Sequence, residues 1–410
     1  MKHALIFVLM LSALCMCASA QMAPPTSGID GDRREAMDLY EQNKFEQALP
    51  LLEKVAAARP DDMVVAERLA MVLNSTAMSI TDPEKRKTQR KRARELFLKV
   101  KNSGGKSDLT DVALELLPED GSDPASFSSN AEVEKAMREG ETAFGRGDYK
   151  AARDSYLRAL LIDPNLYHAA LYVGDTYFGE KKWGSAAEWF ARAVQINPDA
   201  ETAYRYWGDS LMMMDKMREA RAKFIEAIIC EPYSKRTWSG VSKWVQRAGL
   251  AFAPPRIQTG AAVSQGTTGA DGKQNINITI DPSTLGKKDD AGAGAAWMIY
   301  GISRSLWQTE KFKKEYPNEK AYRHSLKEEV DALQMAASAI DEKKKQPKNL
   351  KKLDPSIRTL VELDQKGLLE PYVLISAPDQ GIAQDYVAYR SKNREKLRQY
   401  LDEYVVPRMN

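Results

Sequence analysis

A repeat of 34 residues runs through the centre of the chain and constrains its fold more than any other feature. Prolines recur at positions 164, 198 and 232, and small or aromatic residues recur in register before them. The matching positions are Gly140, Gly174 and Gly208; Ala152, Ala186 and Ala220; Tyr156, Phe190 and Phe224; and Ala159, Ala193 and Ala227. Small residues let two helices cross closely, and proline cannot continue a helix. The pattern therefore predicts helix pairs that stack on one another to bury their apolar faces.

This period and pattern resemble the tetratricopeptide repeat family over three consecutive units, from Ala131 to Pro232. The resemblance implies an α-solenoid that binds a partner, with the first helix of each pair lining the concave side. The alternative is a helical bundle whose periodicity arose by chance. Upstream we expect two irregular repeats, with Phe45 to Pro60 as a second helix and a later helix starting at Asp82-Pro83, a favourable cap.

The pattern changes after Leu250. Residues 257–263 and 276–280 alternate in polarity around a turn-rich segment, which predicts a β-hairpin. Helices are expected near 295–316, 318–343, 355–366 and 379–405, and this part resembles no family we recognise. The expected fold is mainly α, a tetratricopeptide-type solenoid followed by a mostly helical carboxy-terminal domain with one β-hairpin.

The expected domains follow from these patterns. They are a signal peptide (1–20), two irregular repeats with a short helix (28–118), a linker (119–130), three regular repeats with a closing helix (131–249), the hairpin with a Gly-rich link (250–290), and a helical domain (291–410).

The amino terminus predicts export. Lys2 precedes an apolar run from Ala4 to Cys17, and Ala18-Ser19-Ala20 forms a small-residue cleavage site before Gln21. No later apolar stretch reaches the length of a membrane span. Cleavage would leave one cysteine, Cys230, and no internal disulfide, so the bacterial periplasm fits better than a eukaryotic secretory route. Losing Lys2 lowers the net charge of +3 by one, to +2, which is too small to steer nucleic acid.

Motifs for catalysis are absent from the sequence. There is no phosphate-binding glycine loop, HExxH, GxSxG or CxxC pattern, so we expect no enzyme activity, no cofactor and no metal site. His324 and Glu328 lie four residues apart and could form an acid–base pair or two metal ligands, but a surface pair on a helix is favoured. Cys230 is expected in the core, and the basic segment 85–94 on a solvated helix face, although it could touch an acidic polymer or lipid.

A partner-binding groove is predicted on the first helices of the regular repeats. Acids recur at Glu141, Asp175 and Asp209, with an apolar side chain one turn later. The full groove comprises Glu134, Met137, Glu141, Phe144, His168, Leu171, Asp175, Phe178, Arg205, Asp209 and Met212. Carboxylates beside apolar groups suit a protein or peptide with basic and apolar side chains. Solvation of the helices alone would also explain these acids.

Two other functions remain open at this stage. The carboxy-terminal domain could hold an unrecognised active site of an envelope enzyme, with His324, Glu328 and tyrosines of the last helix. Alternatively, exposed aromatic residues such as Trp183, Trp297 and Trp307 could bind a cell-wall polymer.

Overall fold

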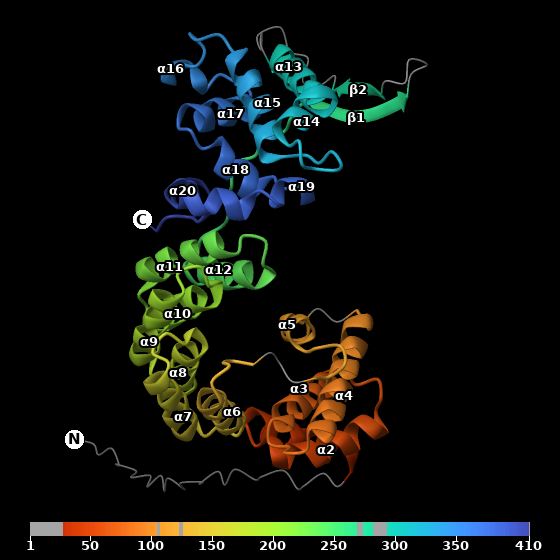
Figure 1. Ribbon diagram of the computed structural model, residues 1–410, viewed down its shortest axis with the longest axis vertical. Coiled ribbons are helices and arrows are strands. Elements are labelled where there is room, and N and C mark those ends of the chain that lie inside the picture. Colours follow the sequence, from red (N-terminus) through yellow and green to blue (C-terminus); the bar gives the residue numbers. More distant parts are fainter. Residues whose placement is uncertain (1–27, 105–106, 123–125, 269–273, 282–292, 410) are drawn as a thin grey trace, which may run out of the picture. The chain divides into compact units, whose positions relative to one another are not determined.

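The computed structural model describes residues 28–104, 107–122, 126–268, 274–281 and 293–409 (Figure 1). The protein is a mainly α-helical solenoid with one small β-hairpin, which confirms the expected fold class. The chain divides into two compact units, Met1–Ala152 and Arg153–Asn410, which we describe separately. The predicted signal peptide and most of the Gly-rich link lie outside the described residues.

The first unit contains two helix pairs, a short helix and the first helix of the regular repeats. The elements are α1 (Ile29–Glu41), α2 (Phe45–Ala58), α3 (Met63–Ala77), α4 (Pro83–Asn102), α5 (Asp108–Leu116) and α6 (Ala131–Gly145). Asp82 accepts hydrogen bonds from the first turn of α4, and Pro83 begins that helix, as the sequence predicts. Leu52, Leu69 and Phe97 are buried in the core of the unit.

The regular repeats continue through the second unit. The boundary between the units falls within α7 (Tyr149–Ile162), and the later helices are α8 (Tyr167–Gly179), α9 (Trp183–Ile196), α10 (Glu201–Met213), α11 (Met217–Cys230) and α12 (Lys235–Arg247). A Cβ atom on Gly174 would lie 2.5 Å from the ring of Phe190, and one on Gly208 would lie 3.0 Å from Phe224. The glycine and aromatic positions of the repeat therefore meet where two helices cross, as the pattern predicts.

The turn inside each helix pair also repeats. Asn43, Gly147, Lys181 and Asp215 each have a positive φ, of 57°, 75°, 59° and 60° respectively. These residues stand two positions before the second helix of their pair, which begins at Phe45, Tyr149, Trp183 and Met217. Glycine adopts this conformation without strain and asparagine or aspartate tolerates it, whereas lysine does not, so the turn at Lys181 carries the most strain.

The carboxy-terminal region is helical, apart from the hairpin. Its elements are β1 (Ala261–Thr268), β2 (Gln274–Ile280), α13 (Ala293–Leu306), a π-helical turn (Trp307–Lys311), α14 (Phe312–Glu315), α15 (Leu326–Ser338), α16 (Pro347–Leu350), α17 (Pro355–Gln365), α18 (Leu369–Ser376), α19 (Gln380–Ala383), α20 (Tyr386–Tyr400) and a closing π-helical turn (Leu401–Val405). The strands pair antiparallel, and Ile278 packs on Gly301 of α13.

Several expected boundaries in this region were wrong. Residues 257–259 precede β1, because the paired strand starts only at Ala261. The helix expected from residue 318 begins at Leu326, where Ser325 caps it, and the last long helix begins at Tyr386 after the short α19. Helix α18 was not expected at all, because its sequence LEPYVLIS is apolar without helical periodicity.

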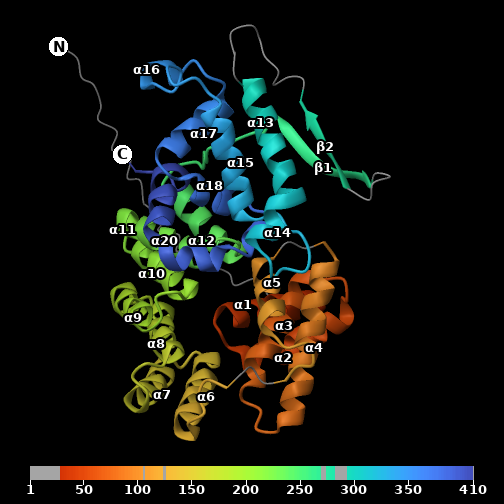
Figure 2. The same cartoon turned by 45° about the horizontal axis from the view of Figure 1, so that its top comes forward.

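Helix α11 of the last repeat lies beside α20 of the carboxy-terminal region (Figure 2), and the two regions share one hydrophobic core. Ile228 and Trp244 of the repeats belong to the same buried cluster as Leu374 and Leu397. Polar contacts reinforce it, since Tyr386 donates a hydrogen bond to the carbonyl of Ile229 at 2.6 Å. The expected boundary near residue 250 therefore does not separate two cores. Across the described residues, none of the helices has both the length and the apolar character of a membrane span.

Candidate protein-binding face

Helices α8 and α10 carry the part of the predicted groove that lies in the second unit. His168 is exposed, and Asp175, Phe178, Arg205 and Asp209 are partly buried. Leu171 and Met212 are buried in the packing between helices, so they offer no surface to a partner. The structure also places Tyr206 among these side chains, a residue that the sequence argument missed. We call His168, Asp175, Arg205, Tyr206 and Asp209 the α8–α10 face.

Arg205 is fixed by neighbouring helices. Its guanidinium donates to Glu201 at 2.7 Å, and Glu201 also accepts a hydrogen bond at 3.0 Å from Thr237 of α12. The guanidinium lies over the ring of Tyr206 at 4.6 Å, and the alkyl stem approaches Gly240. The closing helix thus holds Arg205 in place, and Glu201 already neutralises its charge.

The carboxylate of Asp209 on the α8–α10 face is only partly compensated by nearby cations. Burial raises the pKa of Asp209 to about 6, although the charges of Arg205 and Lys243 act in the opposite direction. Burial also raises the pKa of Tyr206, and the negative charges of Asp175 and Asp209 add to that effect. Tyr206 therefore lies within the electrostatic reach of both carboxylates, and the ionised form of Asp209 is poorly stabilised by the protein alone.

The apolar side chains one turn after the acids have a packing role. Phe178 meets Trp183 edge-on at 4.7 Å, and Phe144 meets Tyr149 at 5.3 Å. In the first helix pair, Tyr40 lies 5.5 Å from Phe45 at the same spacing of five residues. These pairs close the turn between the two helices of a repeat. The sequence contains this signal, since an aromatic residue opens α2, α7 and α9, so the prediction that Phe144 and Phe178 belong to the groove overlooks their packing role.

The groove residues of α6 belong to the first unit. Met137 is fully buried, and Glu141 is partly buried. Glu134 accepts hydrogen bonds from the backbone amide of Phe127 at 2.7 Å and from Ser126 at 2.9 Å. Burial alone would raise the pKa of Glu134, but the bonds from Ser126 and Arg138 lower it. Glu134 therefore fastens the preceding linker to α6, which leaves it little capacity for a partner.

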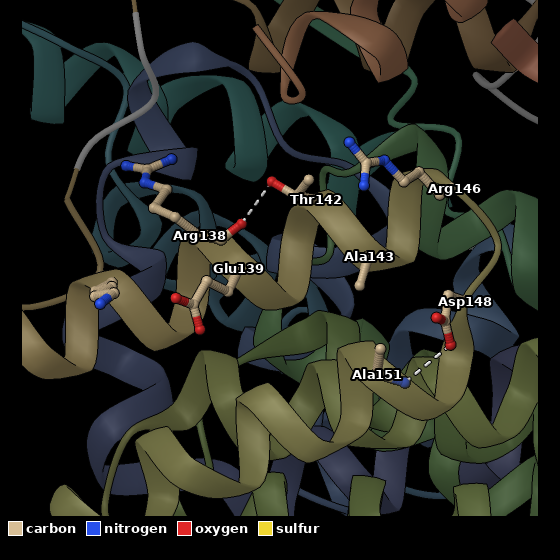
Figure 3. A pocket seen from close by; sticks show the side chains of 8 residues that line it. Arg138, Glu139, Thr142, Ala143, Arg146, Asp148 and Ala151 are labelled. Carbon is tan, nitrogen blue, oxygen red and sulfur yellow. Dashed lines mark hydrogen bonds between the residues drawn. The ribbon is translucent and has the colours of Figure 1, made fainter. Parts of the chain in front are cut away.

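Two open pockets lie on other surfaces of the first unit. One, of about 410 Å³, lies between α6 and the start of α7, where Arg138, Glu139 and Arg146 border it (Figure 3). The other, of about 610 Å³, lies between the α1–α2 turn, the end of α3 and the α6–α7 turn. None of the predicted groove residues lines either pocket.

His324 lies in a polar network of the carboxy-terminal region, not in a surface pair as expected. Its Nε2 lies 3.0 Å from Glu329, and its Nδ1 lies 2.6 Å from Asp379. Glu328 is fully buried and pairs with Arg304 at 2.7 Å. The glutamate that contacts His324 is therefore Glu329 and not Glu328 as predicted, because the helix starting at Leu326 turns Glu329 toward the imidazole.

The network can hold a proton, but both nitrogens of His324 are occupied by carboxylates. Tyr300 and Arg304 each donate to Glu329 at 2.8–2.9 Å, and Tyr322 donates to Glu328 at 2.7 Å. Burial raises the pKa of Tyr300 and of Tyr322, which keeps both phenols protonated. A general base needs a ring nitrogen facing its substrate, so this geometry gives no support to an acid–base role for His324. Among the described residues, no group of three acidic, histidine or cysteine side chains is arranged to hold a metal ion.

The remaining candidates have structural roles. Trp297 and Trp307 are buried, and Trp183 packs on Phe178, so these rings do not form a stacking surface for a polymer. Cys230 is buried as expected, and burial raises the pKa of its thiol to about 11.

The basic segment 85–94 is less solvated than expected. Arg92 pairs with Glu53 of α2, and Arg94 donates to the carbonyl of Leu117 at 3.0 Å. Arg90 is buried. These cations therefore hold neighbouring elements to α4.

Comparisons with known proteins agree with the repeat architecture. The tetratricopeptide repeat model matches residues 33–75 and 137–201. These two stretches of the chain therefore carry tetratricopeptide repeats, and a solenoid of such repeats is an architecture of protein-interaction scaffolds. No curated protein matches the sequence.

Solved structures of two proteins are similar over part of the chain. The first tetratricopeptide domain of Spaghetti, bound to the HSP90 peptide SRMEEVD, is 23% identical and has a TM-score of 0.28, covering 29% of this chain and 96% of that one. A crystal structure of MamA is 19% identical with a TM-score of 0.25, covering 55% of this chain and 100% of that one. A structure of MamA AMB-1 is 16% identical with a TM-score of 0.23, covering 52% of this chain and 96% of that one.

Proposed function

We propose that this protein is a cell-envelope scaffold that holds a protein or peptide partner on the α8–α10 face. The observation that supports it most directly is the state of Asp209, whose carboxyl is partly buried and has a raised pKa. A lysine or arginine of a partner would stabilise the ionised carboxylate, because an opposite charge nearby offsets the loss of solvation. Asp175 supplies a second carboxylate within the electrostatic reach of Tyr206.

The chemistry of the face suits a basic segment that also carries apolar groups. Tyr206 offers a half-buried ring near two acids, and His168 adds an exposed ring one helix away. Because the guanidinium of Arg205 already lies over the ring of Tyr206, a partner's cation would be attracted by the carboxylates of Asp175 and Asp209, and the ring would supply apolar contact. Arg205 is already paired with Glu201, so it does not cancel the acids completely.

The test compares two double variants of the protein. Asp175→Asn with Asp209→Asn neutralises the α8–α10 face, and Glu188→Gln with Glu219→Gln removes the same charge from exposed positions on α9 and α11. Binding is measured by titration with an array of basic and apolar peptides at low and physiological salt. We expect the first variant to weaken binding by about tenfold or more and the control to leave it unchanged. Equal affinity of both variants would refute the face as the binding site.

We also propose that the protein is exported by its amino-terminal segment. The support comes from the sequence alone: a basic residue, an apolar run and Ala18-Ser19-Ala20 before Gln21. Amino-terminal sequencing of the protein recovered from an envelope fraction should begin at Gln21. Recovery of an intact Met1 in the cytosolic fraction would contradict export.

A further inference from the structure

We propose that His324 is a proton-dependent latch that fastens the segment 379–385 to the start of α15 and so supports the docking of α20 on the last repeat. The latch comprises His324, Glu329 and Asp379. The proposal concerns the regulation of the fold and does not depend on the proposed partner.

The geometry places a carboxylate oxygen at each nitrogen of one imidazole. Glu329 comes from α15, whereas Asp379 lies 55 residues away from His324 and precedes α19. Carboxylate oxygens can only accept hydrogen bonds when ionised, so both contacts are satisfied only if both ring nitrogens carry a hydrogen. The closed latch therefore requires the imidazolium form of His324.

Loss of the proton would open one particular contact. A neutral imidazole keeps a single N–H and turns the lone pair of its other nitrogen toward a carboxylate, which is repulsive. Glu329 is buried and held by Tyr300 and Arg304, so it cannot move away. The side chain of Asp379 is 51% exposed and can rotate into water. The neutral form therefore keeps its N–H toward Glu329 and releases Asp379.

The charged groups around the ring of His324 together stabilise its imidazolium form, in which both carboxylate contacts are made. Burial lowers the pKa of His324, and Arg304 of α13 acts in the same direction. Glu329 and Asp379 outweigh both effects, so the pKa is raised from its ordinary value. Glu328 faces Arg304 on the far side of the network, and Arg323 is neutralised by Asp385.

The sign of the pH dependence follows from the raised pKa. The folded protein binds this proton more tightly than the unfolded chain, whose histidine has a pKa of about 6.5. The contribution of the latch is thus complete below that pH and is lost as the pH rises through the higher pKa of the folded state.

The latch acts on a segment that leads directly into α20. Oδ1 of Asp379 caps α19 by accepting hydrogen bonds from the amides of Gly381 and Ile382, both at 2.9 Å. A Cβ atom on Gly381 would lie 2.4 Å from the carbonyl oxygen of His324, so the two backbones are in close contact. Helix α20 begins at Tyr386, and Arg390 on its next turn donates to the carbonyl of Cys230 at 2.6 Å. Arg323 and the backbone amide of Leu326 hold Gly381 and Asp385 in either protonation state, so opening the latch should weaken the anchorage of α20 on α11 without abolishing it.

The first experiment is a histidine titration by NMR, in which His168 is an internal reference. Neighbouring side chains partly desolvate the ring of His168 and lower its pKa, so the two resonances should titrate on opposite sides of about 6.5. Hydrogen exchange of residues 379–400, corrected for the intrinsic effect of pH, is then measured above and below the pKa found for His324. We expect protection to fall on the alkaline side.

Asp379→Asn is the decisive variant, because an asparagine keeps the Oδ1 cap and replaces the second oxygen with a donor. That donor can pair with a neutral imidazole, so the latch should stay closed without the proton, and proton affinity at His324 should fall about tenfold or more. Asp354→Asn is the matched control, since Asp354 caps α17 in the same way without facing a histidine. A His324 pKa at or below that of His168, or an unchanged pH dependence of exchange in Asp379→Asn, would overturn the proposal.

Discussion

The regular repeats and the carboxy-terminal region are stabilised over very different distances along the chain. In the repeats, Gly174 meets Phe190, only 16 residues later, and Gly208 meets Phe224 at the same separation. In the carboxy-terminal region, His324 contacts Asp379, 55 residues away, and Asp402 pairs with Arg221 of α11, 181 residues away. The repeats thus depend on short-range apolar packing, whereas the rest of the protein depends on long-range polar contacts as well. Four substitutions probe this difference, in decreasing order of expected effect.

Arg304→Met should be the most destabilising. It removes the cation shared by Glu328 and Glu329, both of which are buried. Breaking a buried ion pair on one side costs about 3–5 kcal/mol of unfolding free energy, because an uncompensated charge remains. Urea denaturation measures the loss. Lys311→Met is the control, since the partly exposed Lys311–Asp331 pair should contribute less than about 1 kcal/mol. If both variants lost the same unfolding free energy, the buried ion pairs of Arg304 would contribute no more to stability than the partly exposed Lys311–Asp331 pair.

Gly174→Ala should cost about 1–3 kcal/mol, because the new Cβ would overlap the ring of Phe190. Thermal and urea unfolding of the protein report the change. Gly184→Ala is the matched variant in α9, where the nearest atom beyond the local backbone is 4.0 Å from the added Cβ. That variant should be neutral or more stable by up to about 1 kcal/mol. If both alanines were tolerated, close helix crossing would not explain the repeated glycine.

Asp209→Asn should stabilise the protein at neutral pH by about 1–2 kcal/mol. A raised pKa means that the ionised carboxylate destabilises the folded state by about 1.4 kcal/mol for each pKa unit, and the partial exposure of Asp209 to solvent reduces this cost. The folded state keeps a proton on Asp209 up to a pKa of about 6, above the ordinary value of 3.8. Stability from this group is therefore greatest below pH 4 and falls as the pH rises toward 6. Urea unfolding midpoints measured between pH 4 and 6 should show this decrease in stability for the unmodified protein and for Glu188→Gln. Asp209→Asn should not show it.

Lys181→Gly should have the smallest effect, a gain of up to about 1 kcal/mol. Glycine relieves the left-handed strain at φ 59°, but it also makes the unfolded chain more flexible. Lys182→Gly provides the control, since the φ of Lys182 is −89° and glycine relieves no strain there. That variant makes the unfolded chain equally flexible and also removes the partly exposed Lys182–Glu180 ion pair, which contributes less than about 1 kcal/mol. A lower melting temperature for Lys181→Gly than for Lys182→Gly would contradict the repeated turn geometry.

The sequence predicted the repeats well because each contact recurs locally. A glycine, an aromatic residue and a proline at fixed spacing are enough to locate a helix crossing, and the match over residues 33–75 supports the irregular repeats upstream. The groove was harder to predict, because spacing places Asp175 and Asp209 on one face but does not reveal that Met212 is buried. Tyr206 was missed for the same reason, since its exposure depends on how α8 and α10 pack.

The polar network could not be found from local pattern. Asp379 reaches His324 from 55 residues away, and Arg304 reaches Glu328 from 24. The nearby signal was His324 four residues before Glu328, a spacing that a surface pair on a helix explains equally well. A serine cap predicts the position of α15, but it cannot tell which glutamate turns inward. That choice is made by α13, which lies earlier in the chain and carries both Tyr300 and Arg304.

The shared core between α11 and the carboxy-terminal region restricts how this protein can change in evolution. Solenoids commonly lengthen when a unit is duplicated, since each new unit meets the same neighbour on both sides. A 34-residue unit inserted after Pro164 would pack on a repeat at each of its two sides. One inserted after Pro232 would separate α11 from Tyr386 and Arg394, which bind it directly. The array can therefore gain units upstream, while its last repeat is inherited together with the carboxy-terminal region as a single piece.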